Sequence, residues 1–233
     1  MTREKIRRYN ELFTGHLLDV GAGNKPYASL FKNVAVYSGT NTRRYYGAEE
    51  LAILEPLTDY WIEDASSLPL DDNSFESVVC FQVLPVLKEP GRFFAEASRI
   101  LKPDGYLMVT SDFLYPKWSV EDRQRFTDFT LREMAEANGL KIVACESYGG
   151  VLTTLHCLLM RYSRDYLHIL SLRSNILGKF LGAIVYSICL ILMPLFSAVG
   201  VFIYFMEKDN HKAFEFTANV FILAKKTKNV YNS

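Results

Sequence analysis

The residues best suited to chemistry lie at the end of a short apolar run, where Asp19 is followed by Gly21 and Gly23. Residues 17–20 have the pattern of a buried strand, and the next four form a turn in which larger side chains would obstruct a ligand. Glycines let the backbone approach a cofactor, while backbone amides and a nearby carboxylate supply hydrogen-bond partners. This arrangement is typical of a nucleotide site. A purely structural loop is the alternative, because Gly-x-Gly alone is weak evidence.

Two later positions fit the same type of site. In dinucleotide folds an acidic residue roughly 20 positions beyond the glycine turn accepts the ribose hydroxyls. The residue there is Asn41, which can bond a hydroxyl but lacks the charge that strengthens such bonds. Residues 61–64 are predicted to form a strand that ends in the carboxylate of Asp64.

Strands and helices alternate along the part of the chain that must position these residues. Strands are predicted at residues 17–20, 35–38, 61–64, 77–81, 106–110, 141–146 and 216–224. A helix is predicted to begin at Pro90 and to end at residues 102–105, and a second to begin with a capping box at residues 130–133 and to end at Gly139. The pattern predicts an α/β fold with a doubly wound, mostly parallel seven-stranded sheet.

The composition narrows the class of partner. The 26 basic and 26 acidic residues balance, so no overall field argues for nucleic acid. The four cysteines lack metal-ligand spacing, and we therefore expect buried thiols, no metal site and a cytosolic compartment; they are Cys80, Cys145, Cys157 and Cys189. Residues 1–10 are basic and polar with no apolar run behind them, which is not the pattern of a secretory signal.

Four short blocks, in order, resemble class I S-adenosylmethionine-dependent methyltransferases, especially the group called type 11. They are Leu-Asp-Val-Gly-Ala-Gly-Asn-Lys-Pro-Tyr (18–27), Glu-Asp-Ala-Ser-Ser-Leu-Pro-Leu-Asp-Asp-Asn-Ser-Phe-Glu (63–76), Phe-Gln-Val-Leu (81–84) and Glu-Ala-Ser-Arg-Ile-Leu-Lys-Pro-Asp-Gly-Tyr (96–106). The resemblance covers residues 17–147 and implies that the cofactor is S-adenosylmethionine.

The resemblance also implies a role for each matching residue. Asp19, Gly21 and Gly23 would shape the pocket for the methionine part of the cofactor, and Asn41 would face the ribose. The Asp64 carboxylate would take the adenine amine, and the Ala65 amide would reach a ring nitrogen. Gln82 would lie beside the methionine or the methyl group. The structural alternatives are a helix cap for Asp64 and a surface loop residue for Gln82.

The sequence departs from the family pattern after the third block. Members often have Glu-His where this chain has Pro85 and Val86, so a histidine that could line the reaction centre is absent. Asn41 also stands where an acid is expected. Two alternatives therefore remain: the protein binds the cofactor weakly, or it keeps the fold without catalysing methyl transfer.

For methyl transfer from a sulfonium, the protein must mainly align the nucleophile, the methyl carbon and the leaving sulfur. It must also supply a proton acceptor if the nucleophile is a neutral hydroxyl. Asp112 and Tyr115 follow the fifth strand and are the best-placed candidates at the carboxyl edge of the sheet. Arg123 and Arg125 resemble a segment of glycan-directed members and could hold an anionic substrate bidentately. Ordinary loop roles and a surface salt bridge are the alternatives.

Residues 181–206 contain no charged side chain, and a run of this length is a candidate for membrane insertion. Basic residues precede it, as expected on a cytoplasmic side: Arg161, Arg164, Arg173 and Lys179. Pro194 disfavours one unbroken helix, so we expect a re-entrant or interfacial hairpin with both ends on one side. The alternatives are a helical cap buried in the protein or a dimer interface, and a single span with the last strand misassigned.

These inferences combine into one prediction. Residues 1–150 and 214–228 would form a cofactor-binding methyltransferase domain, and residues 151–213 a helical, apolar membrane-associating insertion. The chain would methylate, most simply on oxygen, a lipid-linked, glycan-type or other lipophilic acceptor at the cytoplasmic face of a membrane. The alternatives are a non-catalytic scaffold with this fold and a nicotinamide-dependent oxidoreductase. The absence of a full Gly-x-Gly-x-x-Gly argues against the oxidoreductase.

Overall fold

The computed structural model describes residues 2–114, 117, 121–161, 187, 195–207 and 217–227. The chain divides into two compact units. The first comprises Met1–Phe113, Lys117–Ser147 and Asn219–Ser233, and the second comprises Leu114–Pro116 and Tyr148–Ala218. Half of residues 181–206 and all of Tyr115 lie outside the described residues.

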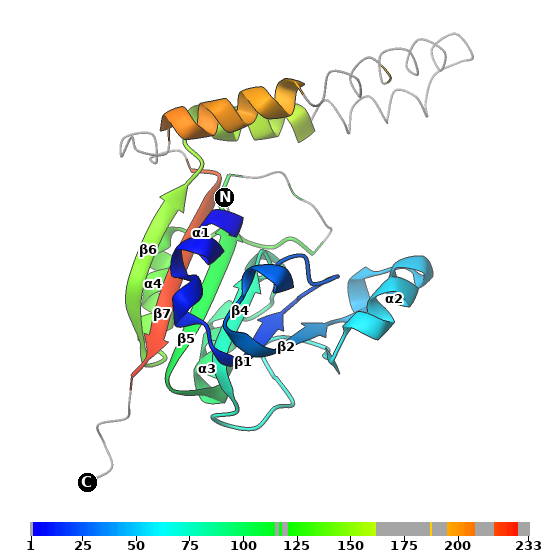
Figure 1. The fold of residues 1–233 in the computed structure, drawn as a ribbon, viewed down its shortest axis with the longest axis vertical. Helices are drawn as coiled ribbons and strands as arrows, with labels where there is room; N and C mark the ends of the chain where they lie inside the picture. The colour runs from blue at the N-terminus through cyan, green and yellow to red at the C-terminus, as the bar shows by residue number, and fades with distance from the viewer. Residues whose placement is uncertain are drawn as a thin grey trace. The chain divides into compact units, whose positions relative to one another are not determined.

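A seven-stranded sheet forms the centre of the first unit, in the order β3-β2-β1-β4-β5-β7-β6 (Figure 1). The strands are β1 (Gly15–Val20), β2 (Val34–Asn41), β3 (Tyr60–Trp61), β4 (Phe75–Phe81), β5 (Leu101–Asp112), β6 (Leu140–Tyr148) and β7 (Asn219–Lys226). The pairs β1–β2, β1–β4, β2–β3 and β4–β5 are parallel, and β7 runs antiparallel to β5. The predicted doubly wound, mostly parallel sheet is confirmed.

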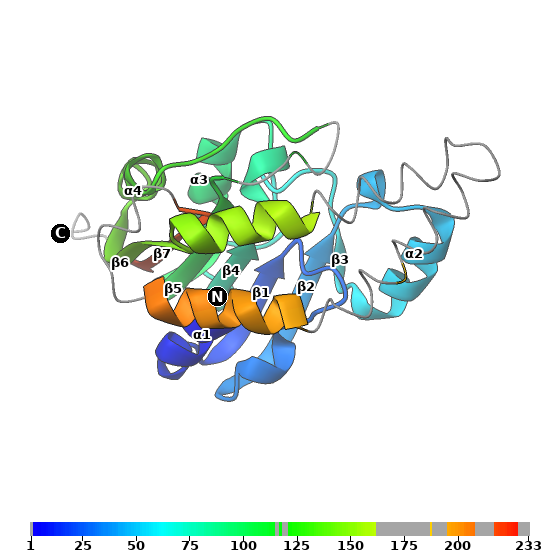
Figure 2. The same cartoon turned by 90° about the horizontal axis from the view of Figure 1, so that it is seen from above.

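Helices cover both faces of this sheet (Figure 2). α3 (Pro90–Ile100) and α4 (Asp128–Glu136) lie on one face, and α1 (Thr2–Tyr9) lies on the other. α2 (Ala48–Leu54) lies beside the edge formed by β2 and β3. Short 3₁₀ helices complete the connections: η1 (Asn10–Leu12), η2 (Ala28–Leu30), η3 (Arg43–Tyr45), η4 (Glu55–Leu57) and η5 (Leu84–Val86).

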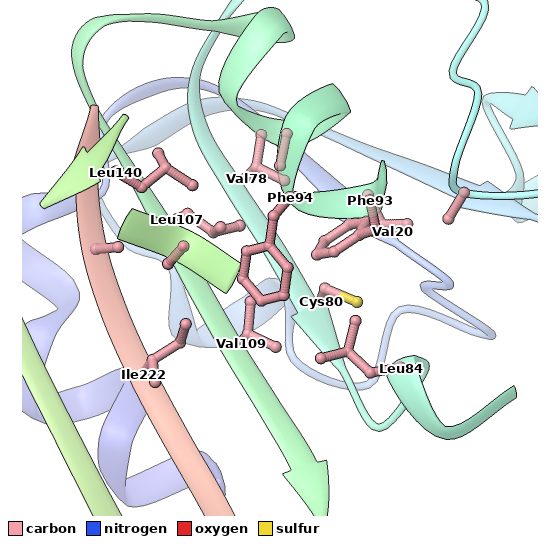
Figure 3. Packing of buried hydrophobic residues seen from close by; sticks show 14 of the residues in the cluster. Val20, Val78, Cys80, Leu84, Phe93, Phe94, Leu107, Val109, Leu140 and Ile222 are labelled. Carbon is pink, nitrogen blue, oxygen red and sulfur yellow. The ribbon is translucent and has the colours of Figure 1, made fainter. Parts of the chain in front are cut away.

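The main core lies between the sheet and α3 with α4 (Figure 3). Phe93 and Phe94 of α3 are fully buried and stack edge-to-face, with ring centroids 5.4 Å apart. Burying each such ring contributes roughly 1.5–3 kcal/mol. Alternate residues of four strands pack against these helices, which explains why β4 is an unbroken apolar run: its two faces meet two layers.

The structure corrects several predicted boundaries. β3 is only two residues long, so Asp64 lies in a turn beyond the strand. α3 ends at Ile100, before the predicted end at residues 102–105, because β5 begins at once at Leu101. The register shift between Phe75 and Ser77 accommodates residues 102–105 within the strand. The last strand begins at Asn219.

The predicted cap of the helix after residue 130 is wrong. α4 starts at Asp128, and its N-cap is Thr127, whose Oγ1 accepts a hydrogen bond from the Thr130 backbone N–H at 3.1 Å. Thr130 has the right residue type but already lies in the first turn, where its own N–H needs the cap.

In the second unit, residues 151–161 and 195–207 form two helices that lie side by side (Figures 1 and 2). The Glu207 carboxylate accepts hydrogen bonds from the backbone N–H groups of Leu152 and Thr153, each at 2.8 Å. It thus caps the beginning of the first helix from the end of the second. A Cβ at Gly200 would overlap the His156 ring, so glycine permits the close approach of the two helices.

The two ends of this unit meet. The Ala218 backbone N–H donates to the Gly149 carbonyl at 2.9 Å, and Thr217 Oγ1 donates to the Tyr148 carbonyl at 2.7 Å. The chain therefore returns to its starting point before β7 enters the sheet. The position of β7 contradicts the alternative in which this strand is misassigned. Among the described residues, none of the helices combines the length and the apolar character that crossing a bilayer requires.

Candidate functional site

The glycine turn after β1 has the backbone geometry that its sequence predicts. Gly21 and Gly23 have φ values of +75° and +53°, in the left-handed region that favours glycine. A Cβ at Gly21 would overlap the Val83 side chain, whereas a Cβ at Gly23 would meet nothing within 4 Å. Gly21 is therefore required by packing within the protein, and Gly23 presents backbone that a ligand can approach.

Asn41 braces this turn. Its side-chain Oδ1 accepts from the Gly23 backbone N–H at 2.8 Å, and its Nδ2 donates to the Gly23 carbonyl at 3.1 Å and to Thr58 Oγ1 at 2.8 Å. A carboxylate could accept the first bond but could not donate the other two. This explains an amide where the family pattern suggests an acid. Asn41 is only 2% exposed, and its predicted contact with a ribose stays a prediction.

Asp19 lies below the turn and is also buried. The Tyr37 hydroxyl donates a hydrogen bond to Asp19 Oδ2 at 2.5 Å. Burial raises the pKa of Asp19 to about 7, against the effects of the Tyr37 hydrogen bond and the nearby Lys25 ammonium. The carboxyl does not line the cleft described next, and its predicted role in shaping the methionine pocket stays a prediction.

A cleft opens beside the turn, at the carboxyl ends of the first strands. It contains four of the residues predicted to bind a cofactor, namely Gly21, Asn41, Asp64 and Ala65. Its apolar walls and its rim were not predicted from the sequence; they are formed by Val20, Ile62, Val83, Val86, Leu87, Arg44, Tyr45 and Lys88. Pro85 and Val86 themselves lie in η5, so the departure from Glu-His supplies part of an apolar wall.

Asp64 lines this cleft, and only one of its carboxylate oxygens has a partner among the described residues. Oδ1 accepts from the Ser66 backbone N–H and from Ser66 Oγ, both at 2.8 Å, which forms a tight turn. No donor of the described residues reaches Oδ2. No helix follows Asp64, so the alternative of a helix cap is wrong.

A strap, defined here as residues 121–126, joins two walls of the cleft. Glu121 accepts from Arg44 Nη2 at 2.6 Å and from the Tyr45 hydroxyl at 2.9 Å. Gln124 Nε2 donates to the Leu87 carbonyl at 3.0 Å. Because Arg44, Tyr45 and Leu87 all line the cleft, the strap ties the η3 wall to the η5 wall.

The predicted substrate-binding arginines differ in their surroundings. Arg125 forms a two-bond ion pair with Asp122, one bond being Nη2 to Oδ2 at 2.9 Å. The Arg123 side chain is exposed, and its backbone N–H donates to the Pro85 carbonyl at 2.8 Å. The ion pair suggested as the alternative is therefore present at Arg125, and a substrate role for either arginine stays a prediction.

Asp112 lies at the carboxyl end of β5, opposite Asn219 of β7, and is 8% exposed. Burial raises its pKa to about 6, while Arg125 opposes this shift and Asp122 adds to it. Tyr115, the second catalytic candidate, lies outside the described residues.

Gln82 follows β4 and reaches toward the same end of the sheet. Its Nε2 donates to Asn219 Oδ1 at 2.6 Å. Asn219 was not among the predicted site residues, and no local signal could have identified it, because the two partners are 137 residues apart in the chain. Gln82 is partly buried, so the alternative of an ordinary surface loop residue does not describe it.

Comparison with known families gives one matching model, described as "Methyltransferase domain", over residues 18–109. The chain is 30% identical over 122 residues to demethylmenaquinone methyltransferase of Renibacterium salmoninarum, which covers 51% of this chain and 49% of that protein. It is 27% identical over 109 residues to phosphatidylethanolamine N-methyltransferase of Cereibacter sphaeroides, covering 44% and 53%. The chain thus spans about half the length of the curated relatives it matches.

Solved structures share the fold at lower identity. The [4+2]-cyclase SpnF matches with a TM-score of 0.60 and 21% identity, over 97% of this chain and 80% of that one. A putative methyltransferase from Bacillus halodurans C-125 matches with a TM-score of 0.59 and 14% identity, over 97% and 99%. Haemonchus contortus phosphoethanolamine N-methyltransferase 2, solved with S-adenosyl-L-methionine, matches with a TM-score of 0.59 and 17% identity, over 97% and 52%. Since one neighbour is a cyclase, these likenesses establish the fold alone.

Proposed function

This chain carries a methyltransferase domain of the class I S-adenosylmethionine-dependent family, and from that premise we propose that it transfers a methyl group to a lipophilic acceptor at a membrane face. The observation that carries the proposal is the cleft beside the glycine turn. Its position at the carboxyl ends of parallel strands, its apolar walls and its few polar groups suit a nucleoside ligand.

The residues present fit S-adenosylmethionine. The Asp64 Oδ2 atom is available for the exocyclic amine of adenine, and Ile62 and Leu87 offer apolar surface to the ring. Gly23 leaves open space beside the turn, while its backbone N–H and carbonyl are both bonded to Asn41. The nicotinamide-dependent alternative gains no support, because the turn continues with Lys25 and Pro26 and not with a third glycine.

The bound cofactor supplies a methyl group that its sulfonium has already activated, so the protein must mainly align the acceptor. We assign Asp112 as the group that accepts the proton of an acceptor hydroxyl. With its pKa near 6, the carboxylate is ionised at neutral pH and still more basic than an ordinary aspartate. The outcome would be O-methylation of the acceptor.

Binding of the cofactor is tested by calorimetric titration with S-adenosylmethionine and S-adenosylhomocysteine. Asp64→Asn keeps an oxygen for the Ser66 turn but removes the charged acceptor, and we expect affinity for both ligands to fall about ten-fold, the loss of about 1.4 kcal/mol typical of a charged hydrogen bond. Glu63→Gln, which removes a neighbouring carboxylate that also lines the cleft, is the matched control. Absence of binding by the unaltered chain at millimolar ligand would exclude the proposal.

The membrane part of the proposal is supported by the helices of the second unit. Large apolar side chains are exposed on both helices, residues 151–161 and residues 195–207, and Phe202 is 65% exposed. The full set is Val151, Leu152, Leu155, Leu159, Leu195, Phe196, Val199, Val201, Phe202, Phe205 and Met206. So many exposed apolar side chains on one helix pair mark an interaction surface. The names of both curated relatives are those of enzymes for lipid-soluble molecules.

Flotation with vesicles of phosphatidylcholine and phosphatidylglycerol tests this surface. The double variant Phe202→Glu with Phe205→Glu should lose most of the vesicle-bound fraction. Phe129→Glu is the matched control, because Phe129 of α4 is equally exposed at 64% but lies in the first unit. Equal flotation of all three proteins, or none by the unaltered chain, would refute the association. The acceptor would be sought as a 14-dalton difference in lipid extracts of cells with and without the protein.

A second candidate is a methyltransferase-fold binding protein without catalysis. The observation in its favour is that Asn41, at the place expected for a ribose-binding acid, has both ends of its amide engaged by Gly23 and Thr58. Tight cofactor binding together with an unaltered lipid profile would favour this candidate.

A further inference from the structure

Gln82 holds a strained backbone position at the carboxyl end of β4. Its φ is +62°, in the left-handed region that residues with a side chain rarely adopt. Its backbone N–H donates to the Thr110 carbonyl at 2.9 Å, which ties the turn to β5. Such conformations persist where the surrounding structure imposes them, and they cluster at ligand sites.

The carboxamide of Gln82 is held at one end only. Nε2 donates to Asn219 Oδ1 at 2.6 Å, whereas Oε1 is buried and accepts from no donor within the described part of the chain. Of the buried side-chain polar atoms without a hydrogen-bond partner among the described residues, Gln82 Oε1 is the one that follows β4, level with the glycine turn, where a bound ligand can supply the donor.

The register of the sheet places Gln82 between the two halves of the proposed site. Val20 pairs with Cys80, so Gln82 is level with the glycine turn that follows β1, and the side chain of the next residue, Val83, packs over Gly21. On the other side, Asp112 pairs with Asn219. Directly opposed residues of an antiparallel pair direct their side chains to the same face, so Asn219 stands beside the acidic group.

Building on the proposed function, we propose that Asn219 is a positioning residue: it orients the Gln82 carboxamide so that Oε1 accepts a hydrogen bond from the ammonium group of the amino-acid end of the cofactor. An ammonium is a donor only, so it needs the oxygen and not the amide nitrogen facing it. Because Asn219 Oδ1 accepts from Nε2, the reversed orientation would place two acceptors against each other. Asn219, the first residue after the second unit, thereby takes part in the cofactor site.

Calorimetric titration of four proteins with two ligands tests this assignment at pH 7.5. S-adenosylhomocysteine carries the ammonium, and 5′-methylthioadenosine lacks the amino-acid end. Asn219→Ala should weaken S-adenosylhomocysteine about ten-fold and change 5′-methylthioadenosine less than about two-fold. Asn219→Asp keeps an acceptor for Nε2 and should restore binding to within about three-fold. Ser111→Ala, which removes a buried hydroxyl at the same edge, is the control.

A second comparison addresses whether Asn219 acts through Gln82. The double variant Gln82→Ala with Asn219→Ala should bind S-adenosylhomocysteine no more weakly than Gln82→Ala alone. Additive losses, equal losses for both ligands, or no rescue by Asn219→Asp would overturn the assignment while leaving the proposed function intact. If the unaltered chain binds neither ligand, the proposed function fails and this inference falls with it. Should Asn219→Ala not fold, Gln82→Ala and Asn219→Asp still give the ligand comparison.

Discussion

Asp19 is an acidic side chain that the fold keeps from water. Its carboxyl, 2% exposed, receives a hydrogen bond from Tyr37 and has a pKa near 7 because burial disfavours the charged form. In the unfolded chain the same carboxyl would ionise near its ordinary value of 3.8. Between these two values the folded state binds more protons than the unfolded state.

This difference has a definite sign. Where the folded state binds more protons, the free energy of unfolding falls as the pH rises, by at most about 1.4 kcal/mol per pH unit for one group. The unaltered chain should therefore lose stability between about pH 4 and pH 7, and the loss from Asp19 should level off above pH 7. Asp19→Asn should lack this part of the slope.

Urea unfolding at several pH values measures both proteins. Asp112 contributes in the same direction up to about pH 6, but it is present in both proteins and cancels in the difference. Parallel pH profiles for the two proteins would show that Asp19 is not protonated in the folded state.

The N-cap of α4 differs from the one expected from the sequence: it is Thr127 and not Thr130. Thr127→Ala removes the side chain that accepts from the Thr130 N–H, and loss of an N-cap typically costs about 1 kcal/mol. Thr130→Ala should cost clearly less, because Thr130 lies inside the first turn. Chemical denaturation of the two variants checks the order, and a larger loss for Thr130→Ala would restore the cap expected from the sequence.

The strap, residues 121–126, should slow the dissociation of a ligand from the cleft. Glu121→Gln removes the charge that joins Arg44 and Tyr45 to residues 121–126 across the cleft. We expect S-adenosylhomocysteine to dissociate several-fold faster in stopped-flow measurements, with the melting temperature unchanged, since exposed ion pairs add little to stability.

Glu55→Gln is the matched control for the strap. Glu55 pairs with the neighbouring Arg43 at 2.9 Å, and this pair does not involve the strap. An equal change in dissociation rate for both variants would mean that surface charge, and not the strap, governs release of the ligand.

At the scale of the whole molecule, the second unit leaves and rejoins the chain at adjacent points. Gly149 and Ala218 are hydrogen bonded at 2.9 Å, so a short linker can replace residues 151–215 without moving β6 or β7. We expect the shortened chain to keep its circular dichroism spectrum and its affinity for S-adenosylhomocysteine, and to lose flotation with vesicles. A shortened chain that unfolds would show that the sheet depends on the second unit.

Local patterns in the sequence were sufficient for the alternation of strands and helices and for the turn at Gly21 and Gly23. Each depends on neighbouring residues, through the period of apolar positions or the steric freedom of glycine. The cap of α4 was missed although it is local, because Thr127 and Thr130 are both suitable cap residues three positions apart, and only the structure shows which side chain accepts the hydrogen bond.

Only the tertiary structure decided how the site is held together. Asn41 braces Gly23, Glu121 joins the strap to η3, and Asn219 orients Gln82 across 137 residues of chain. Hydrogen bonds of this kind depend on the distance between atoms after the sheet has formed, and a side chain gives no local sign of its distant partner. The sequence determined which residues could bind a nucleotide, and the packing of β4, β5 and β7 determined which of them are already engaged by the protein itself.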